Sequence, residues 1–168
     1  MKSWSEYECA MRQPRENNSV KEIIIPKEKA VFWMDGNGRW HNADGPFRHP
    51  KLIRYFNSAI NWDSNGFFVS QDLGDRHEKV YFRCAETALF AMEASIKTGI
   101  ELLLNTRQRI PLDCQKLCVK NDRLFMHYKE ILVKFTDRCM MQLSAYIEEI
   151  DDAYYFRFNE TRCRIALS

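Results

Sequence analysis

The segment Asp35-Gly-Asn-Gly38 constrains the fold more than any other part of the chain, because two of its four residues are glycines. Glycine adopts the positive φ angles that tight hairpin turns need, and Asn and Asp tolerate them better than most residues do. An apolar, β-prone run at 30–34 precedes the segment, and residues 39–41 follow it. The pattern predicts a β-hairpin whose strands flank this turn.

A helix is predicted shortly after the hairpin. Asp44-Gly45-Pro46 is typical of a turn, and Pro50 suits the first turn of a helix, where its missing N–H is not needed. Four apolar side chains then recur at helical spacing and give the helix one apolar face: Leu52, Ile53, Phe56 and Ile60. The polar segment 61–66 is expected to end the helix.

The remainder of the chain predicts mainly strands separated by polar turns. Residues 88–96 are ambiguous, because their Ala, Met and Glu favour a helix, whereas the turn-like 97–99 and the apolar run 100–104 favour a β-meander. We interpret 88–96 as a strand. The other predicted strands are 22–25, 67–73, 79–84, 100–104, 118–120, 124–128, 130–135, 154–158 and 163–167.

A second helix is predicted near residue 137. Thr136 or Asp137 can cap it by accepting a hydrogen bond from a free backbone N–H. Its apolar stripe consists of Phe135, Cys139, Leu143 and Ile147. The acidic segment 148–152 is expected to be a solvated connection to the last strands.

These elements predict an α+β fold with antiparallel sheets and two main helices. A chain of 168 residues corresponds to about one domain. We expect a poorly ordered lead-in at 1–21, an α+β subdomain at 22–104, and a mainly β subdomain with one helix at 105–168.

Composition points to a soluble, globular chain and excludes little else. The 25 basic and 23 acidic residues give a net charge of +2, which is too balanced to indicate a nucleic-acid or membrane partner. No run of 18 apolar residues occurs, and the first 20 residues lack the apolar stretch of a signal peptide. The six cysteines are too dispersed for a secreted disulfide scaffold, so we predict reduced thiols and a cytoplasmic location.

Several short motifs resemble known families. The sequences Gly38-Arg-Trp40, Asp44-Gly-Pro-Phe47 and Leu52-Ile-Arg-Tyr-Phe56 are similar to motifs of the bacterial domain-of-unknown-function family numbered 1285. Further motifs are Glu78-Lys79, Asn105-Thr106 and Ile110-Pro-Leu-Asp113. The mitochondrial uncharacterised family numbered 0598 is also similar, through Phe82-Arg-Cys84, Phe90 and Arg164-Ile-Ala-Leu167.

The resemblance spans residues 30–167 and implies an N-terminal α+β portion followed by a mainly β portion. It implies no catalytic residue. The chain departs from the bacterial family at two places, with Thr87-Ala-Leu-Phe90 where that family has Asp-Ala-Pro-Phe, and Gln71 where it has proline. A ligand shared with the family at that loop therefore does not follow from the motifs.

The candidate ligand-binding site lies where the hairpin and the helix entrance are expected to meet. Trp40 would supply a ring for stacking, Arg48 and Arg54 would supply guanidinium groups, and Asp44 and His49 would complete the polar rim. We therefore predict a non-enzymatic module that binds a small anionic ligand or a protein partner, without a cofactor.

Other hypotheses rest on overlapping residues. A hydrolase or transferase could use the group Asp35, His41, Asp44 and His49. Nucleic-acid binding has some support from aromatic residues among the basic residues Arg39, Arg48, Lys51 and Arg54. A second basic patch consists of Arg107, Arg109, Lys116, Lys120 and Arg123.

A metal site is not predicted. Cys114, Cys118 and His127 supply three of the four ligands that a structural zinc site needs, and no Cys-x-x-Cys pair accompanies them. Oligomeric state and ligand identity lie beyond these patterns.

Overall fold

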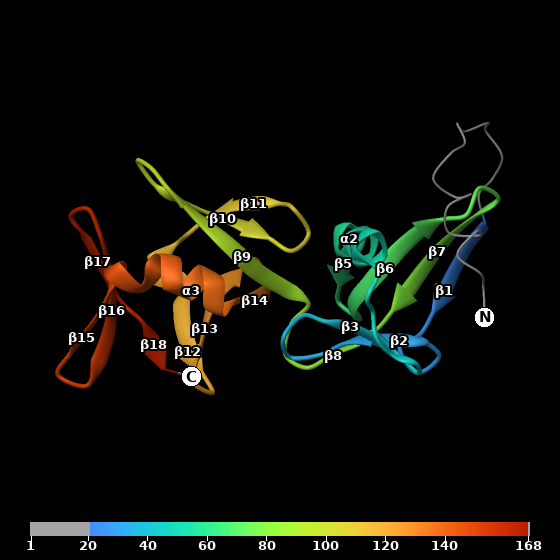
Figure 1. Ribbon diagram of the computed structural model, residues 1–168, viewed down its shortest axis with the longest axis horizontal. Coiled ribbons are helices and arrows are strands. Elements are labelled where there is room, and N and C mark those ends of the chain that lie inside the picture. The colour runs from blue at the N-terminus through green and yellow to red at the C-terminus, as the bar shows by residue number, and fades with distance from the viewer. Residues whose placement is uncertain (1–20, 168) are drawn as a thin grey trace. The chain divides into compact units, whose positions relative to one another are not determined.

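A computed structural model describes residues 21–167, and its contacts divide the chain into two compact units (Figure 1). Among the described residues, the first unit contains 21–34 together with Trp40–Arg83, and the second contains Asp35–Arg39 together with 84–167. The subdomain boundary expected between residues 104 and 105 lies inside the second unit. The lead-in expected at 1–21 lies outside the described residues, except for Lys21, which begins the first strand.

The first unit contains a four-stranded sheet in the order β1-β7-β6-β5. Strand β6 pairs antiparallel with β5 and β7, whereas β1 runs parallel to β7, with Ile25 opposite Val80. The bounds are β1 Lys21–Ile25, β5 Ile60–Asp63, β6 Gly66–Asp72 and β7 Arg76–Tyr81.

The predicted hairpin is confirmed. Strands β2 (Phe32–Met34) and β3 (Trp40–Asn42) pair antiparallel around the turn, and β4 (Gly45–Pro46) pairs with β3. Strand β8 (Arg83–Cys84), where the chain passes into the second unit, is the fourth strand of this sheet. Gly38 has a φ of 77°, and a Cβ there would meet the Phe90 ring at 3.0 Å, so the turn needs glycine both for its backbone conformation and for space.

The helix after the hairpin is also confirmed, but it ends earlier than predicted. Helix α2 spans Pro50–Ser58, with Pro50 in its first turn and the Phe56 side chain buried. The prediction extended it to Ile60, which instead pairs with Val69 as the first residue of β5. The backbone N–H of Ser70 donates to the Ala59 carbonyl at 3.1 Å, so the chain begins to pair with β6 directly after the helix.

The second unit contains a seven-stranded sheet in the order β11-β10-β9-β14-β13-β12-β18. Most pairs are antiparallel, whereas β9 with β14 and β12 with β18 are parallel. The bounds are β9 Leu89–Ile96, β10 Ile100–Leu104, β11 Arg109–Pro111, β12 Leu117–Lys120, β13 Arg123–Tyr128, β14 Ile131–Phe135 and β18 Ala166–Leu167. Strand β9 resolves the ambiguity at 88–96 in favour of a strand.

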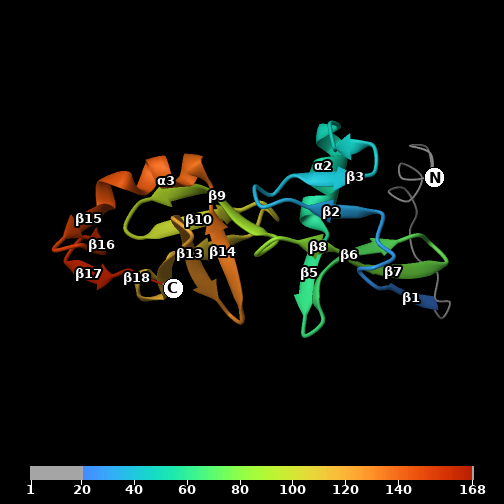
Figure 2. The same cartoon turned by 90° about the horizontal axis from the view of Figure 1, so that it is seen from below.

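The second helix, α3, spans Asp137–Leu143 and follows β14 directly. The Thr136 hydroxyl accepts a hydrogen bond from the Cys139 N–H at 3.3 Å, which confirms the predicted cap. Cys139 and Leu143 are fully buried, but Phe135 lies in β14 and Ile147 begins a strand, so the helix is shorter than its predicted stripe. Figure 2 shows α3 lying along β9, where the Gln142 side chain accepts from the Ala94 N–H at 2.8 Å.

The acidic segment after α3 is mostly exposed, as predicted, but it forms a strand and a turn where a simple connection was expected. Its first half belongs to β15 (Ile147–Ile150), which forms a three-stranded antiparallel sheet with β16 (Ala153–Phe158) and β17 (Thr161–Arg164). The remaining two residues, Asp151 and Asp152, make the turn between β15 and β16 and have positive φ angles. Short 3₁₀ turns lie at Cys114–Lys116 and Ser144–Tyr146.

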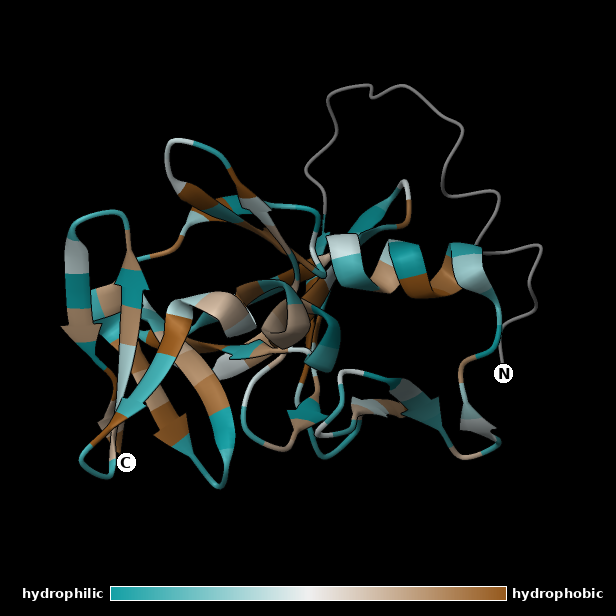
Figure 3. Cartoon of the chain, turned by 60° about the vertical axis from the view of Figure 1, so that its left-hand side comes forward, coloured by the Kyte–Doolittle hydropathy of each residue, from teal (hydrophilic) through white to brown (hydrophobic). Residues whose placement is uncertain are grey.

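Together these elements confirm the α+β class, with two helices in the described chain and mixed sheets in place of purely antiparallel ones. Figure 3 shows hydrophobic residues along the strands and hydrophilic residues in the turns that connect them. The structure also joins Cys114 to Cys163 in a disulfide, which contradicts the expectation of reduced thiols for these two cysteines.

Candidate functional site

Trp40 lies in the core of the first unit, so the stacking role predicted for it is wrong. Its side chain is 1% exposed, and its ring lies 5.2 Å from that of Phe56 and 4.7 Å from that of Phe82. The indole Nε1 donates a hydrogen bond to the Asn57 Oδ1 at 2.8 Å. An enclosed ring whose only polar atom is paired has no face left for a ligand.

The other four residues of the predicted site are exposed. Asp44 lies in the turn before β4, where its N–H donates to the Asn42 side chain at 3.0 Å. Arg48 and His49 precede α2, and Arg54 lies on it. None of them lines either of the two cavities described below.

The group proposed for catalysis is divided between the two units. The Asp35 carboxylate accepts hydrogen bonds from the N–H groups of Asn37 and Arg39, both at 2.9 Å, and so holds the hairpin turn in the second unit. His41, in the first unit, stacks its ring on Trp33 with the centroids 5.7 Å apart. These contacts give Asp35 and His41 structural roles in the hairpin.

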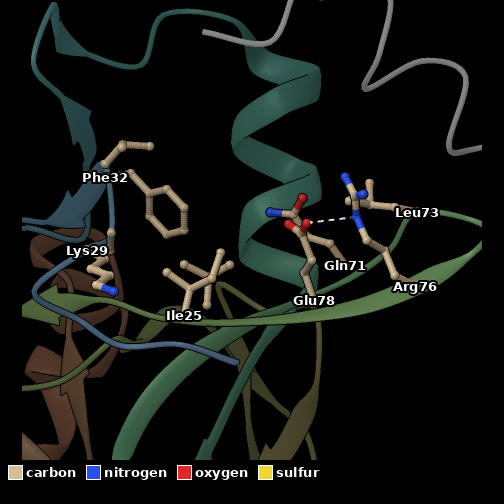
Figure 4. A pocket seen from close by; sticks show the side chains of 10 residues that line it. Ile25, Lys29, Phe32, Gln71, Leu73, Arg76 and Glu78 are labelled. Carbon is tan, nitrogen blue, oxygen red and sulfur yellow. Dashed lines mark hydrogen bonds and ion pairs between the residues drawn. The ribbon is translucent and has the colours of Figure 1, made fainter. Parts of the chain in front are cut away.

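A cavity of about 470 Å³ opens in the first unit, beside the parallel pair β1 and β7 (Figure 4). This volume is in the range of small-molecule sites. Most of its wall is apolar, with four polar side chains among the lining residues. The lining consists of Ile25, Lys29, Ala30, Val31, Phe32, Gln71, Leu73, Arg76, Glu78 and Val80.

Gln71 is the most unusual residue of this cavity. It is a polar side chain only 6% exposed, on the same face of β6 as the fully buried Val69. None of the hydrogen bonds among the described residues uses its side-chain amide, and Figure 4 shows no bond from it to the residues around it. Because no fully enclosed side-chain nitrogen or oxygen lacks a partner in the described chain, the amide must reach the cavity surface. Its partner must therefore be water or a ligand.

Arg76 and Glu78 form an ion pair next to Gln71. The Arg76 Nε donates to the Glu78 Oε1 at 3.1 Å, and the Glu78 side chain is 16% exposed. This bond uses one of the five N–H donors of the guanidinium group. The remaining donors, the Gln71 amide and the Lys29 ammonium group give the cavity an excess of hydrogen-bond donors.

A second polar cluster joins β5 and β7 in the same unit. The Asp63 carboxylate accepts hydrogen bonds from the Lys79 ammonium group and, at 2.7 Å, from the Tyr81 hydroxyl. The Lys79 Nζ also lies 4.0 Å from the centre of the Phe68 ring. The hydrogen bonds from Lys79 and Tyr81 lower the pKa of Asp63 to about 2, and the bond to Asp63 raises the pKa of Lys79.

We expect this cluster to make stability depend on pH below about 4. Because the folded pKa of Asp63 is lowered from 3.8 to about 2, the carboxylate stabilises the fold at higher pH, and this contribution is lost as the pH falls through that range. Urea unfolding between pH 6 and pH 2 should therefore show a gap between the wild-type chain and Asp63→Asn that closes toward pH 2. The exposed Asp75→Asn should show no such gap, and a gap for Asp63→Asn that persists at pH 2 would contradict this account.

The second unit has a smaller cavity, of about 290 Å³. It brings together Arg39, from the first predicted basic set, and Arg123, from the second patch. Lys134, which sequence reasoning missed because it lies in a strand between apolar residues, also lines it. Its Nζ donates to the Glu86 Oε2 at 2.8 Å, and this bond lowers the pKa of Glu86.

The described residues hold no cluster of three or more His, Cys, Asp or Glu side chains that could bind a metal ion. Of the three residues considered for zinc, Cys114 is in the disulfide, Cys118 is buried and His127 is exposed. No helix among residues 21–167 is long and apolar enough to cross a membrane.

Comparison with known proteins shows which solved structures share the fold of this chain, and it indicates no activity. No family model matches the sequence, and no curated protein matches it. The chain is similar in structure to a DUF1285 family protein from Silicibacter pomeroyi DSS-3, with a TM-score of 0.63 and 11% identity over 88% of this chain and 84% of that one. A DUF1285 family protein from Shewanella baltica OS155 is similar with a TM-score of 0.51 and 11% identity, over 68% of this chain and 91% of that one.

These two structures confirm, at the level of the fold, the resemblance found from the short motifs. The similarity to the mitochondrial family stays a prediction.

Proposed function

From the fold that this chain shares with DUF1285 family proteins, and from the cavity of its first unit, we propose that the chain binds a small carboxylic acid with an apolar body. The observation that supports this most is Gln71, a polar residue only 6% exposed at the wall of a largely apolar cavity, whose side-chain amide has no protein partner among the described residues. Leaving a buried amide without any partner is unfavourable by about 1–3 kcal/mol, so an amide that no protein group satisfies favours a ligand that can accept its hydrogen bond in place of cavity water.

The chemistry of the lining selects a carboxylate head group. The Gln71 NH₂ group and the free N–H groups of Arg76 are donors, and a guanidinium group binds the two oxygens of a carboxylate in parallel. Glu78 keeps Arg76 oriented through their ion pair. The body of the ligand would lie against Ile25, Phe32 and Val80, which supply the apolar wall.

We expect Gln71→Leu to weaken binding by about 10- to 100-fold, because a hydrogen bond to a charged group contributes about 1.5–3 kcal/mol. The melting temperature should stay constant or rise, since leucine fills the volume without an unpaired amide. Calorimetric titration with octanoate measures the affinity, and octan-1-ol serves as the uncharged analogue, which should bind more weakly. Gln108→Leu, at an exposed position in the second unit, is the matched control.

The same titration tests the face predicted from the sequence. If the cavity is the site, the double variant Arg48→Ala with Arg54→Ala should bind octanoate like the wild-type chain, because neither residue lines the cavity. Loss of binding in this double variant, with full binding in Gln71→Leu, would place the site on the exposed face of α2. Absence of octanoate binding by the wild-type chain would reject the proposed ligand class.

A cytoplasmic location, and a protein partner in place of a small molecule, remain proposals from the sequence. The disulfide between Cys114 and Cys163 argues against a reducing compartment, because cytosolic thiols are kept reduced. Cell fractionation combined with thiol labelling before lysis tests the location and the redox state together.

A further inference from the structure

The cavity of the second unit gathers three cationic side chains around a small space. Its lining includes Arg39, Arg123 and Lys134, with Asp137 as the single carboxylate. Counting Glu86, which pairs with Lys134, three cations face two carboxylates, so the cavity keeps an excess of positive charge, although the whole chain is close to neutral. A local excess of this kind favours a small anion.

Arg39 is held in place by the turn before it. The Asp35 carboxylate accepts from the Arg39 N–H, and the Asp35 N–H donates to the Arg39 carbonyl, both at 2.9 Å. This turn also contacts the sheet of the second unit. The Lys134 Nζ donates to the Gly36 carbonyl at 2.9 Å, and Gly38 lies against the Phe90 ring. Two strands of one sheet and a five-residue turn thus converge on the cavity.

All three cations keep donors for a ligand. Lys134 uses two of its three N–H groups, for Gly36 and Glu86. The Arg123 Nη1 donates to the Asp137 Oδ1 at 2.7 Å, which leaves most of its five donors. Within residues 21–167, no ion pair or side-chain hydrogen bond engages the Arg39 guanidinium group.

We propose that this cavity binds a tetrahedral oxyanion, either inorganic phosphate or the phosphate group of a small monoester. Two guanidinium groups and an ammonium group match the several acceptor oxygens of phosphate, and arginine forks bind two of these oxygens at once. A volume of about 290 Å³ suits such a group better than a large ligand. This phosphate site shares no residue with the proposed carboxylic-acid site and lies in the other unit. An experiment can therefore reject one of the two proposals without affecting the other.

Calorimetric titration of the full chain with inorganic phosphate, at low chloride, tests the proposal. We expect Arg39→Gln and Arg123→Gln each to weaken phosphate binding by about tenfold or more, because each removes charge-assisted hydrogen bonds. Asp137→Asn should tighten it several-fold, because it removes the opposing charge and releases Arg123. Arg109→Gln is the matched control, since Arg109 belongs to the same unit, has similar exposure and pairs with Glu101 away from the cavity.

A parallel titration with phenyl phosphate distinguishes the two sources. Equal affinity for both compounds supports inorganic phosphate, and tighter binding of the ester supports a monoester; either result agrees with an oxyanion site. The proposal is overturned if neither compound binds, or if Arg109→Gln reduces affinity as much as Arg39→Gln does, because the effect would then come from net charge alone.

Discussion

Replacing Trp40 by alanine is expected to lower the free energy of unfolding by about 3–5 kcal/mol, because truncating a fully buried tryptophan removes its packing and leaves a cavity. Its ring contacts Phe56 and Phe82, and the variant also leaves the Asn57 side chain without its partner. Urea unfolding followed by circular dichroism measures the change. Trp40→Phe should retain part of the stability, because it keeps an aromatic ring at this position.

Trp33→Ala is the matched control for this prediction. Trp33 belongs to the same hairpin but is only partly buried and stacks on His41, so its loss should change stability much less. A stable Trp40→Ala variant that fails to bind a ligand would restore the stacking role predicted from the sequence.

Reduction of the disulfide between Cys114 and Cys163 is expected to destabilise the second unit by about 2–4 kcal/mol. The bond closes a segment with a sequence separation of 49, and closing a loop of that length removes considerable entropy from the unfolded chain. It connects the 3₁₀ turn at Cys114–Lys116 to β17, so it also fastens the three-stranded sheet to the rest of the unit. Urea unfolding with and without a phosphine reductant measures the effect.

The double variant Cys114→Ser with Cys163→Ser should show the lower stability under both conditions. Cys84→Ser keeps the disulfide and should still respond to reductant. If thiol titration of the unfolded, unreduced chain finds every cysteine free, the pair is reduced in solution, which is the state that the dispersed cysteines predict.

Local patterns predicted the elements well where one residue type fixes the geometry. The segment Asp35-Gly-Asn-Gly38 predicted the hairpin, Pro50 the start of α2, and Thr136 or Asp137 the cap of α3, which is Thr136. The ends of the two helices were predicted less well, because a residue that fits the helical apolar pattern can instead pair in a strand. Ile60 continues the apolar stripe of α2 but pairs with Val69, and Ile147 continues that of α3 but pairs with Phe156.

The cavity of the first unit could not be predicted, because it depends on pairing between distant segments. Nothing in the sequence around Ile25 indicates that it lies opposite Val80. One local signal was present: Gln71 follows Val69 by two residues, so a strand would place both side chains on the same face. The same rule applied to Arg39, Trp40 and His41 would have turned the indole inward.

The division of the chain at the hairpin has a practical consequence for work with fragments. Asp35–Arg39 belongs to the second unit, yet both of its ends continue into strands of the first. A fragment that starts at Cys84 would lack the carbonyl of Gly36 that Lys134 binds, and would uncover the Phe90 ring. No single cut in the backbone can therefore yield two intact halves, and deletion experiments should retain the whole of residues 21–167.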